Sequence, residues 1–188
     1  MKVENNDLVW GSSGSIGDML VFKQQAGKTI IAKRPRKRET PPSEDQVKVN
    51  ERFSEAVQYA RGVINDDVRK AVYQLKARPG VSAYNIALSD YCKAPEIKRA
   101  NLSGYTGKAG EQILIRAIDD FMVKTVRVEI LDSNLEPIEE GEAVLSENNL
   151  DWIYTSQTLN PNPESSTIRV SASDLPGNVT SKDYTLDN

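Results

Sequence analysis

Two groups of side chains in this 188-residue sequence have the types and spacing that binding chemistry needs. The first is a cationic run over residues 33–38, in which five of six residues are basic. Its members are Lys33, Arg34, Arg36, Lys37 and Arg38. Such a run binds phosphates or an acidic protein surface, and Pro35 with the prolines at 41–42 keeps it extended.

Three interpretations of this basic segment are open. It contacts an acidic protein surface, including that of a neighbouring copy; it contacts nucleic acid; or it is a solvated loop. No aromatic side chains interleave with the cations for base stacking, and no known nucleic-acid-binding module is present. A protein contact is therefore preferred to nucleic acid.

The second group is a set of oxygen ligands beside predicted turns: Asp119, Asp120, Asp174 and Asn178. Such side chains can coordinate Ca²⁺ when their loops meet. Asp and Asn also favour turns by bonding to their own backbone, and Gly177-Asn178 is an ordinary hairpin turn. Turn chemistry is the simpler explanation, so we predict no metal site and no cofactor, and we expect calcium to be dispensable.

Residue counts restrict catalysis. The chain has no histidine and one cysteine, which excludes a His base, a His-containing metal site and an intrachain disulfide. Cys92 lies at a predicted helix end without an activating histidine, as expected for a structural thiol. We therefore predict no catalytic residues, no small-molecule substrate and no enzyme activity.

Charge is divided unevenly along the chain. Residues 1–108 carry 19 Lys and Arg against 12 Asp and Glu, whereas residues 109–188 carry 5 against 15. The net charges of +7 and −10 suggest two units with different surroundings and permit attraction between unlike ends of neighbouring copies. Two domains with different solvated surfaces would give the same split.

No run of residues has the length of a signal-peptide core or approaches the ~20 apolar residues of a membrane span. We therefore expect a soluble protein without a signal peptide. It would lie in the cytoplasm or in a particle released from the cell.

The first 108 residues predict a β-hairpin followed by three short helices. Runs 19–22 and 29–32 flank a loop in which Gly27 suits the left-handed position, and residues 11–18 are turn-forming. Ser43 and Gln46 have the spacing of a helix capping box. The apolar stripe of the first helix is Val49, Phe53, Ala56, Val57, Ala60 and Ile64, and that of the second is Val68, Ala71, Val72 and Leu75. Ser82 begins the third helix, and the three helices predict a small bundle.

Residues 109–188 lose the helical period and predict an antiparallel β-sandwich. The predicted strands are 112–117, 123–130, 142–145, 152–154, 167–172 and 179–186. Trp152 and Tyr154 share one side of a strand, and we favour a core position for both, with Ile153 outward. The Gly/Ser-containing stretch 102–110 is the predicted boundary. The fold class is therefore α+β in two units, a basic hairpin and helical domain (1–108) and a β-sandwich domain (109–188) that should fold alone.

Several short motifs carry a resemblance. The strand that ends in Ala-x-Asp-x-x-Gly-Asn, here 172–178, and the Trp-x-Tyr strand at 152–154 resemble those of bacterial Ig-like domains of the fibronectin/cadherin-like kind, as do 115–120, 126–128 and 141–143. The resemblance implies an Ig-like sandwich over about 80 residues. The N-terminal part is similar to bacterial and prophage-type proteins that open with a glycine turn, a basic hairpin and a Gln-x-x-x-x-x-Arg-Phe helix.

These observations together predict a non-catalytic structural or adaptor protein. The helical unit would anchor it to an assembly, a phage-like particle or a secretion-type machine, and the Ig-like domain would present a binding surface. Its partner would be another protein or copies of itself. The alternative is a nucleic-acid-associated protein that uses the basic hairpin segment.

Overall fold

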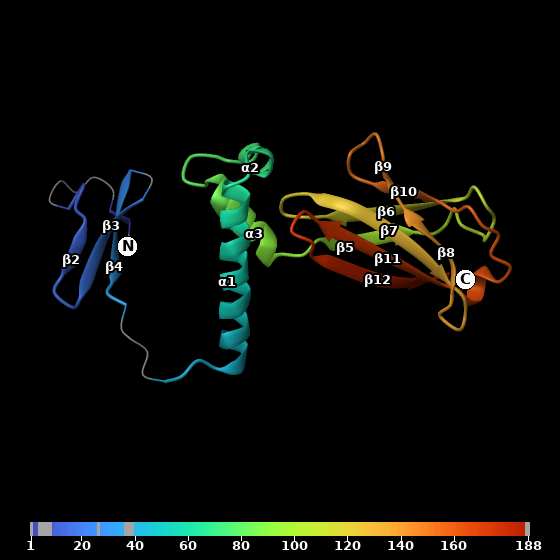
Figure 1. Cartoon of the computed structure of the whole chain (residues 1–188), viewed down its shortest axis with the longest axis horizontal. Helices are drawn as coiled ribbons and strands as arrows, with labels where there is room; N and C mark the ends of the chain where they lie inside the picture. The colour runs from blue at the N-terminus through green and yellow to red at the C-terminus, as the bar shows by residue number, and fades with distance from the viewer. Residues whose placement is uncertain (1, 4–8, 26, 36–39, 187–188) are drawn as a thin grey trace. The chain divides into compact units, whose positions relative to one another are not determined.

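The structure is a computed structural model that describes residues 2–3, 9–25, 27–35 and 40–186 (Figure 1). It contains helices and three antiparallel four-stranded sheets, so the α+β class is confirmed at that level. The chain divides into two compact units, Met1–Ile86 and Ala87–Asn188.

The first unit begins with an antiparallel sheet in the order β1-β4-β3-β2. Its strands are β1 (Lys2–Val3), β2 (Gly14–Ile16), β3 (Leu20–Gln25) and β4 (Lys28–Lys33). The predicted hairpin is confirmed, because β3 pairs with β4 and Gly27 between them has φ 75°. The turn-forming stretch 11–18 also contributes β2, which pairs with β3.

Three helices follow, as predicted: α1 (Glu44–Ile64), α2 (Asp67–Gln74) and α3 (Ala83–Cys92). The capping box at the start of α1 is present, with the Gln46 amide donating to the Ser43 hydroxyl and the Gln46 side chain accepting from the Ser43 amide. Asp66 caps α2 through the amides of Val68 and Arg69. Among the described residues, no helix combines the length and apolar character needed to cross a membrane.

The apolar stripe of α1 is buried over only half of its length. Ala56, Ala60 and Val63 are fully buried, whereas Val49 and Phe53 on the same stripe are 66% and 52% exposed. The prediction that the whole stripe packs inward was therefore wrong for its first turns. A helical period identifies a face but not the length over which a partner covers it.

The apolar stripe predicted for α2 is not its buried face either. Tyr73 is its buried residue, and its hydroxyl lies 2.8 Å from that of Tyr59 on α1. Val68 and Leu75 are exposed instead. The large tyrosine ring with a polar partner takes the contact that the smaller aliphatic residues were expected to make.

The second unit contains two antiparallel sheets. The first has the order β5-β6-β10-β9 and the second the order β12-β11-β7-β8. Their strands are β5 (Glu96–Asn101), β6 (Gln112–Ile118), β7 (Val123–Leu131), β8 (Pro137–Glu142), β9 (Val144–Leu145), β10 (Trp152–Thr155), β11 (Thr167–Asp174) and β12 (Val179–Thr185). A short 3₁₀ turn, η1 (Pro163–Ser165), precedes β11.

One hydrophobic core joins the two sheets. Alternate residues of β6 and β7 enter it, with Ile113 and Ile115 from one sheet and Val126 and Val128 from the other. Strict alternation of buried and partly exposed residues along β11 supplies Ile168, Val170 and Ala172. The period-2 pattern that predicted these strands thus marks the core face correctly.

The boundary between the units lies earlier than the predicted one at 108/109. Strand β5 pairs with β6 and places Ile97 in the core, and Tyr105 in the loop after β5 is also buried there. The sequence Glu96–Asn101 has a single large apolar residue, so it carries little strand signal. Residues 109–188 therefore lack an edge strand and two core side chains of the sandwich.

This boundary predicts different behaviour for two fragments. Residues 81–188 should give a β-rich far-UV circular dichroism spectrum and a cooperative melt. Residues 109–188 should melt at a much lower temperature or not fold, because each large apolar side chain missing from a core costs about 1.5–3 kcal/mol. Equal melting temperatures for the two fragments would show that β5 contributes nothing to the fold.

Candidate functional site

The basic segment predicted from the sequence is only partly described. Lys33 ends β4 and is exposed. Arg34 forms an ion pair with Asp18, and its guanidinium donates to the carbonyl of Gly17 at 3.1 Å. Arg36, Lys37 and Arg38 lie outside the described residues. One of the two described cations is thus engaged with the sheet's own loop, and Lys33 faces solvent.

The N-terminal sheet combines cations with exposed apolar side chains. Strand register places Phe22 opposite Ile31 and Leu20 opposite Lys33, so these four side chains share one face. Phe22 is largely buried, but Leu20 is 37% exposed, and Ile16, opposite Leu20 on β2, is 59% exposed. Large apolar groups on a sheet that otherwise carries lysines are typical of a protein-binding surface.

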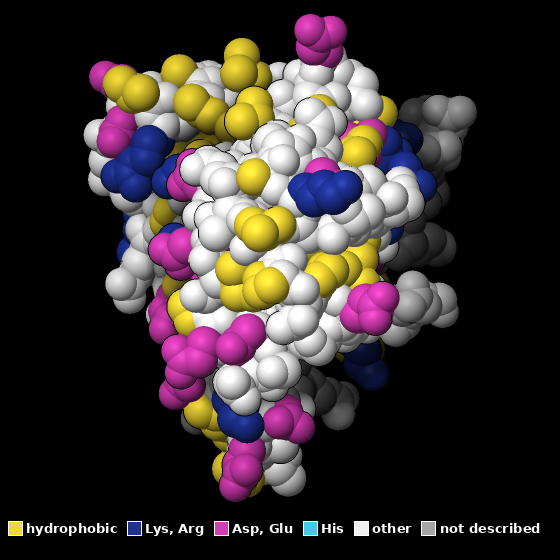
Figure 2. All heavy atoms as spheres, turned by 90° about the vertical axis from the view of Figure 1, so that its right-hand side faces the viewer, with side chains coloured by type: hydrophobic (Ala, Val, Ile, Leu, Met, Phe, Trp, Pro, Cys, Tyr) yellow, Lys and Arg dark blue, Asp and Glu magenta, His cyan; other side chains and the backbone are white. Residues whose placement is uncertain are grey.

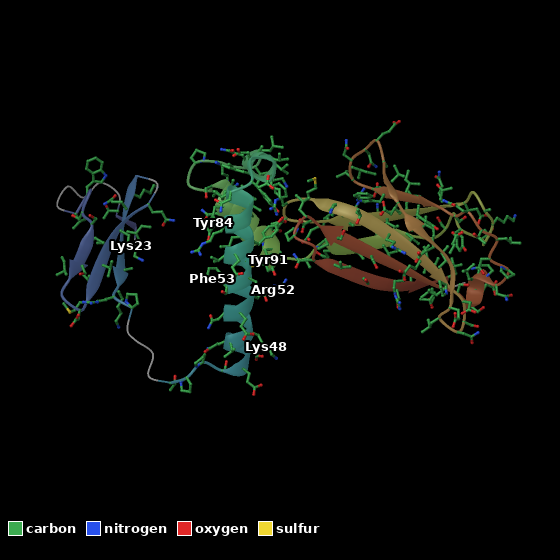
Figure 3. All side chains as sticks on the ribbon, viewed as in Figure 1. Lys23, Lys48, Arg52, Phe53, Tyr84 and Tyr91 are labelled. Atoms are coloured by element: carbon green, nitrogen blue, oxygen red, sulfur yellow. The ribbon has the colours of Figure 1, made fainter. Side chains whose placement is uncertain are left out.

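Helix α1 carries a second surface of the same character. Lys48, Arg52 and Phe53 all project from α1 (Figure 3), where Phe53 continues the exposed half of the apolar stripe with Val49. At 3.6 residues per turn, Lys48 and Arg52 lie together along one margin of that stripe. We call Val49 and Phe53, with these two cations, the α1 surface.

The oxygen ligands considered for calcium separate into two groups. Asp119 and Asp174 converge, whereas the Asp120 carboxylate pairs with Lys93 at the surface. The hydrogen bond and charge of Asp120, with a further contribution from Asp119, raise the pKa of Lys93. Asn178 supplies its amide nitrogen, which donates to Asp174 at 2.7 Å and lies 3.2–3.4 Å from the carbonyl oxygens of residues 90, 91 and 93.

Asp90 is the member that sequence analysis missed. One oxygen each from Asp90, Asp119 and Asp174 lies within 4.8 Å of the others. Asp90 is in the last turn of α3, where a carboxylate meets the negative end of the helix dipole. That unfavourable position is the sequence signal that could have identified it.

Turn chemistry explains part of this arrangement, as predicted. Asp119 Oδ2 accepts from the amides of residues 121 and 122 at 3.0 and 2.9 Å. Asp174 Oδ1 accepts from the amides of residues 177 and 178 at 2.8 and 2.7 Å. Both aspartates therefore stabilise the turns that follow their strands. Asp90 lies in a helix, so a turn does not explain its position in the cluster.

The core position predicted for the Trp-x-Tyr strand is confirmed. Tyr154 is 2% exposed and Trp152 is partly buried against the core. Burial and the hydroxyl's contact with Glu139, which accepts at 2.9 Å, raise the pKa of Tyr154. Ile153 faces outward beside Leu114 on β6 and Val144 on β9, which makes an exposed apolar row across this sheet.

An ion pair fixes the loop before β10 to the middle of this sheet. Arg116 on β6 donates twice to Asp151, at 2.8 Å each, and Asn148 donates to the same carboxylate at 2.9 Å. The hydrogen bond from Arg116, followed by that from Asn148, holds the pKa of Asp151 below its usual range. The bidentate geometry orients the loop beside the apolar row.

Comparisons with known proteins find only weak structural similarity. No protein-family model matches the sequence, and no curated protein matches it. CopC from Methylosinus trichosporium OB3b aligns with 48% of this chain and 88% of its own, with 17% identity and a TM-score of 0.35. An engineered protein aligns with 58% of this chain and 30% of its own, with 12% identity and a TM-score of 0.34. These similarities carry no argument about activity or partners.

The lowered pKa of Asp151 predicts a pH-dependent stability. A depressed folded-state pKa stabilises the fold above the unfolded pKa of about 4, and that stabilisation is lost as the pH falls through the folded value. Asp151→Asn should therefore lower the melting temperature at neutral pH, and its difference from wild type should narrow below about pH 4. Asp183→Asn is the matched control, because its bidentate pair with Arg169 is more exposed and should matter less. Unchanged melting of Asp151→Asn at neutral pH would rule out this role.

Proposed function

We propose that this chain is a non-catalytic structural protein that assembles through its first unit and presents an Ig-like β-sandwich. The observation that carries the proposal is the half-covered stripe of α1. Ala56, Ala60 and Val63 in its second half are fully buried, but Val49 and Phe53 in its first half remain exposed. The exposed part of an apolar helix stripe is a surface that a partner in an assembly can bury.

The strand order supports an Ig-like assignment for the sandwich. Lettered in chain order, β5 to β12 become A, B, C, C′, D, E, F and G. The two sheets are then A-B-E-D and G-F-C-C′. Immunoglobulin constant-type domains place A, B, E and D in one sheet and C, F and G in the other.

A second copy of the chain is the partner that the charges favour. Residues 1–86 carry 15 Lys and Arg against 10 Asp and Glu, whereas residues 87–188 carry 9 against 17. Net charges of +5 and −8 attract between unlike units of neighbouring molecules. Acidic side chains gather along the lower left edge of the face in Figure 2 and provide such a surface.

The hollows formed by the described residues support a non-catalytic role. One is lined by the turn around residues 77–82, and another by loop residues 132–134 and 160–166 with Ile138. The carboxylate in the second, Asp132, accepts the amides of Asn134 and Glu136 and so serves its own turn. In the second hollow the hydroxyls of Ser165 and Ser166 donate to the carbonyl of Asn162 and not to a carboxylate base.

The setting expected from the sequence, a phage-like particle or a secretion-type machine, remains a prediction, as does the nucleic-acid alternative. Contact between the basic unit of one copy and the acidic sandwich of the next would build a repeating particle or filament. A heterologous contact of this kind propagates unless its rotation closes a ring.

The proposal predicts salt-sensitive self-association of the full chain. Sedimentation velocity over ~5–200 µM protein should show larger species at ~50 mM salt that diminish at ~500 mM, because screening shortens the reach of the attraction. Lys23→Gln/Lys28→Gln/Lys33→Gln should reduce the association. The matched control, Lys108→Gln/Lys124→Gln/Lys182→Gln, removes the same charge from the second unit and should not.

A second pair of variants tests the α1 surface. Val49→Ser/Phe53→Ser should abolish association, whereas Val68→Ser/Leu75→Ser, which removes even more exposed apolar groups from α2 and its C-cap, should preserve it. A chain that stays monomeric at low salt overturns the self-assembly proposal. Retention of duplex or single-stranded DNA at ~150 mM salt by such a monomer would favour the nucleic-acid alternative.

A further inference from the structure

Three carboxylates from separate elements of the second unit meet at one end of the sandwich. Asp90 comes from the last turn of α3, Asp119 directly follows β6, and Asp174 ends β11. They are distant in sequence, yet one oxygen of each lies within 4.8 Å of the other two. Only the tertiary fold brings them together.

Two of the three carboxylates are fully buried, and Asp119 is partly exposed. Asp90 and Asp174 are each 1% exposed. Asp119 keeps one oxygen on the backbone amides of its turn, but its Oδ1 is buried and accepts no hydrogen bond from the described residues. A carboxylate oxygen in that state loses its hydration without replacement, which is costly unless a cation or a donor is bound there.

Lys93 supplies positive charge near one member of the cluster, Asp119. The ammonium of Lys93 acts on Asp119, but it pairs with Asp120, and both side chains of that pair are about half exposed. Asn178 contributes an uncharged amide that joins Asp174 to the end of α3. The C-terminal end of a helix adds further negative potential.

We propose that Asp90, Asp119 and Asp174 bind one Ca²⁺ ion. Calcium ligands lie at about 2.3–2.6 Å from the ion, so oxygens on opposite sides of it are about 4.6–5.2 Å apart. Three oxygens that are mutually within 4.8 Å fit around one such ion without rearrangement of the strands. The ion fastens the last turn of α3 to the β6–β7 and β11–β12 loops.

Calcium is preferred to magnesium for a geometric reason. Magnesium demands a strict octahedron at about 2.0–2.1 Å and gives up its water ligands reluctantly, whereas Ca²⁺ accepts several protein carboxylates in a flexible arrangement. A site formed by two loops and a helix end also suits the flexible coordination of Ca²⁺ better. This inference does not rest on the proposed assembly, since none of the variants that test the assembly changes these three residues.

Equilibrium dialysis with ⁴⁵Ca²⁺ tests the site directly. Full-length chain stripped with EDTA and returned to pH 7.5 should bind one Ca²⁺ per chain, and binding should raise its melting temperature by several degrees at saturation. Asp90→Asn and Asp119→Asn should each weaken binding by about tenfold or more. Asp120→Asn is the matched control, because it removes an adjacent carboxylate that lies outside the cluster, and its affinity should stay close to wild type.

Two results would overturn the proposal. One is the absence of stoichiometric Ca²⁺ binding up to ~5 mM, a range that covers weak extracellular-type sites. If the apo chain then gained stability as the pH fell from 7.5 to 5.5, protons rather than a cation would balance the cluster. The other is Ca²⁺ binding that survives in both Asp90→Asn and Asp119→Asn, which would place the ion elsewhere. Both variants keep the native side-chain shape, and Asp174 is left unchanged because it also holds its own turn.

Discussion

The pairing of β7 with β11 is the interaction on which the second unit depends. Along it, Val126, Val128 and Ile130 stand opposite Ala172, Val170 and Ile168, all of them fully buried. The pairing is regular until the register shifts between Ser173 and Asp174. The extra residue of this irregularity is Lys124 on β7, so β11 keeps its alternation. The carboxylate of Asp174 therefore lies on the buried face with Ile168, Val170 and Ala172. The core ladder therefore places the carboxylate cluster as well as the sandwich.

The outer face of the same sheet carries charges that are paired across neighbouring strands. Arg169 and Asp183 stand opposite each other and form a bidentate pair, and Ser171 bonds to Ser181 two residues along. Arg127 on β7 pairs with Glu140 on β8, which raises the pKa of the arginine. Cross-strand partners of this kind satisfy one another and leave a solvated surface. The apolar row on the opposite sheet has no such pairing, so it is the better candidate for the surface that the sandwich presents.

The sequence was sufficient wherever a local rule decided the structure. The capping box at Ser43, the hairpin at Gly27 and the strands β6, β7 and β11 were all correctly predicted, because each depends on neighbours along the chain. The failures share a different cause. The position of β5 in the sandwich and the exposure of Val49 both depend on what another element covers, which neither periodicity nor propensity contains. For the same reason Asp119 and Asp174 were recognised as turn residues, while Asp90 was missed.

Charge connects the two proposals. Binding of one Ca²⁺ would change the net charge of residues 87–188 from −8 to −6. Long-range attraction to the +5 unit of another copy scales with the product of the charges, so it would fall by about a quarter. Calcium would then stiffen the end of the sandwich while weakening the attraction that brings copies together. Linkage makes this effect reciprocal. If calcium lowers the affinity between copies by a given factor, a contact with the negatively charged sandwich lowers the affinity for calcium by that same factor. The stabilisation of the sandwich end by calcium should exceed the effect of calcium on association. A bound ion acts on carboxylates in direct contact, whereas the attraction between copies is screened over about 10 Å at ~0.1 M salt.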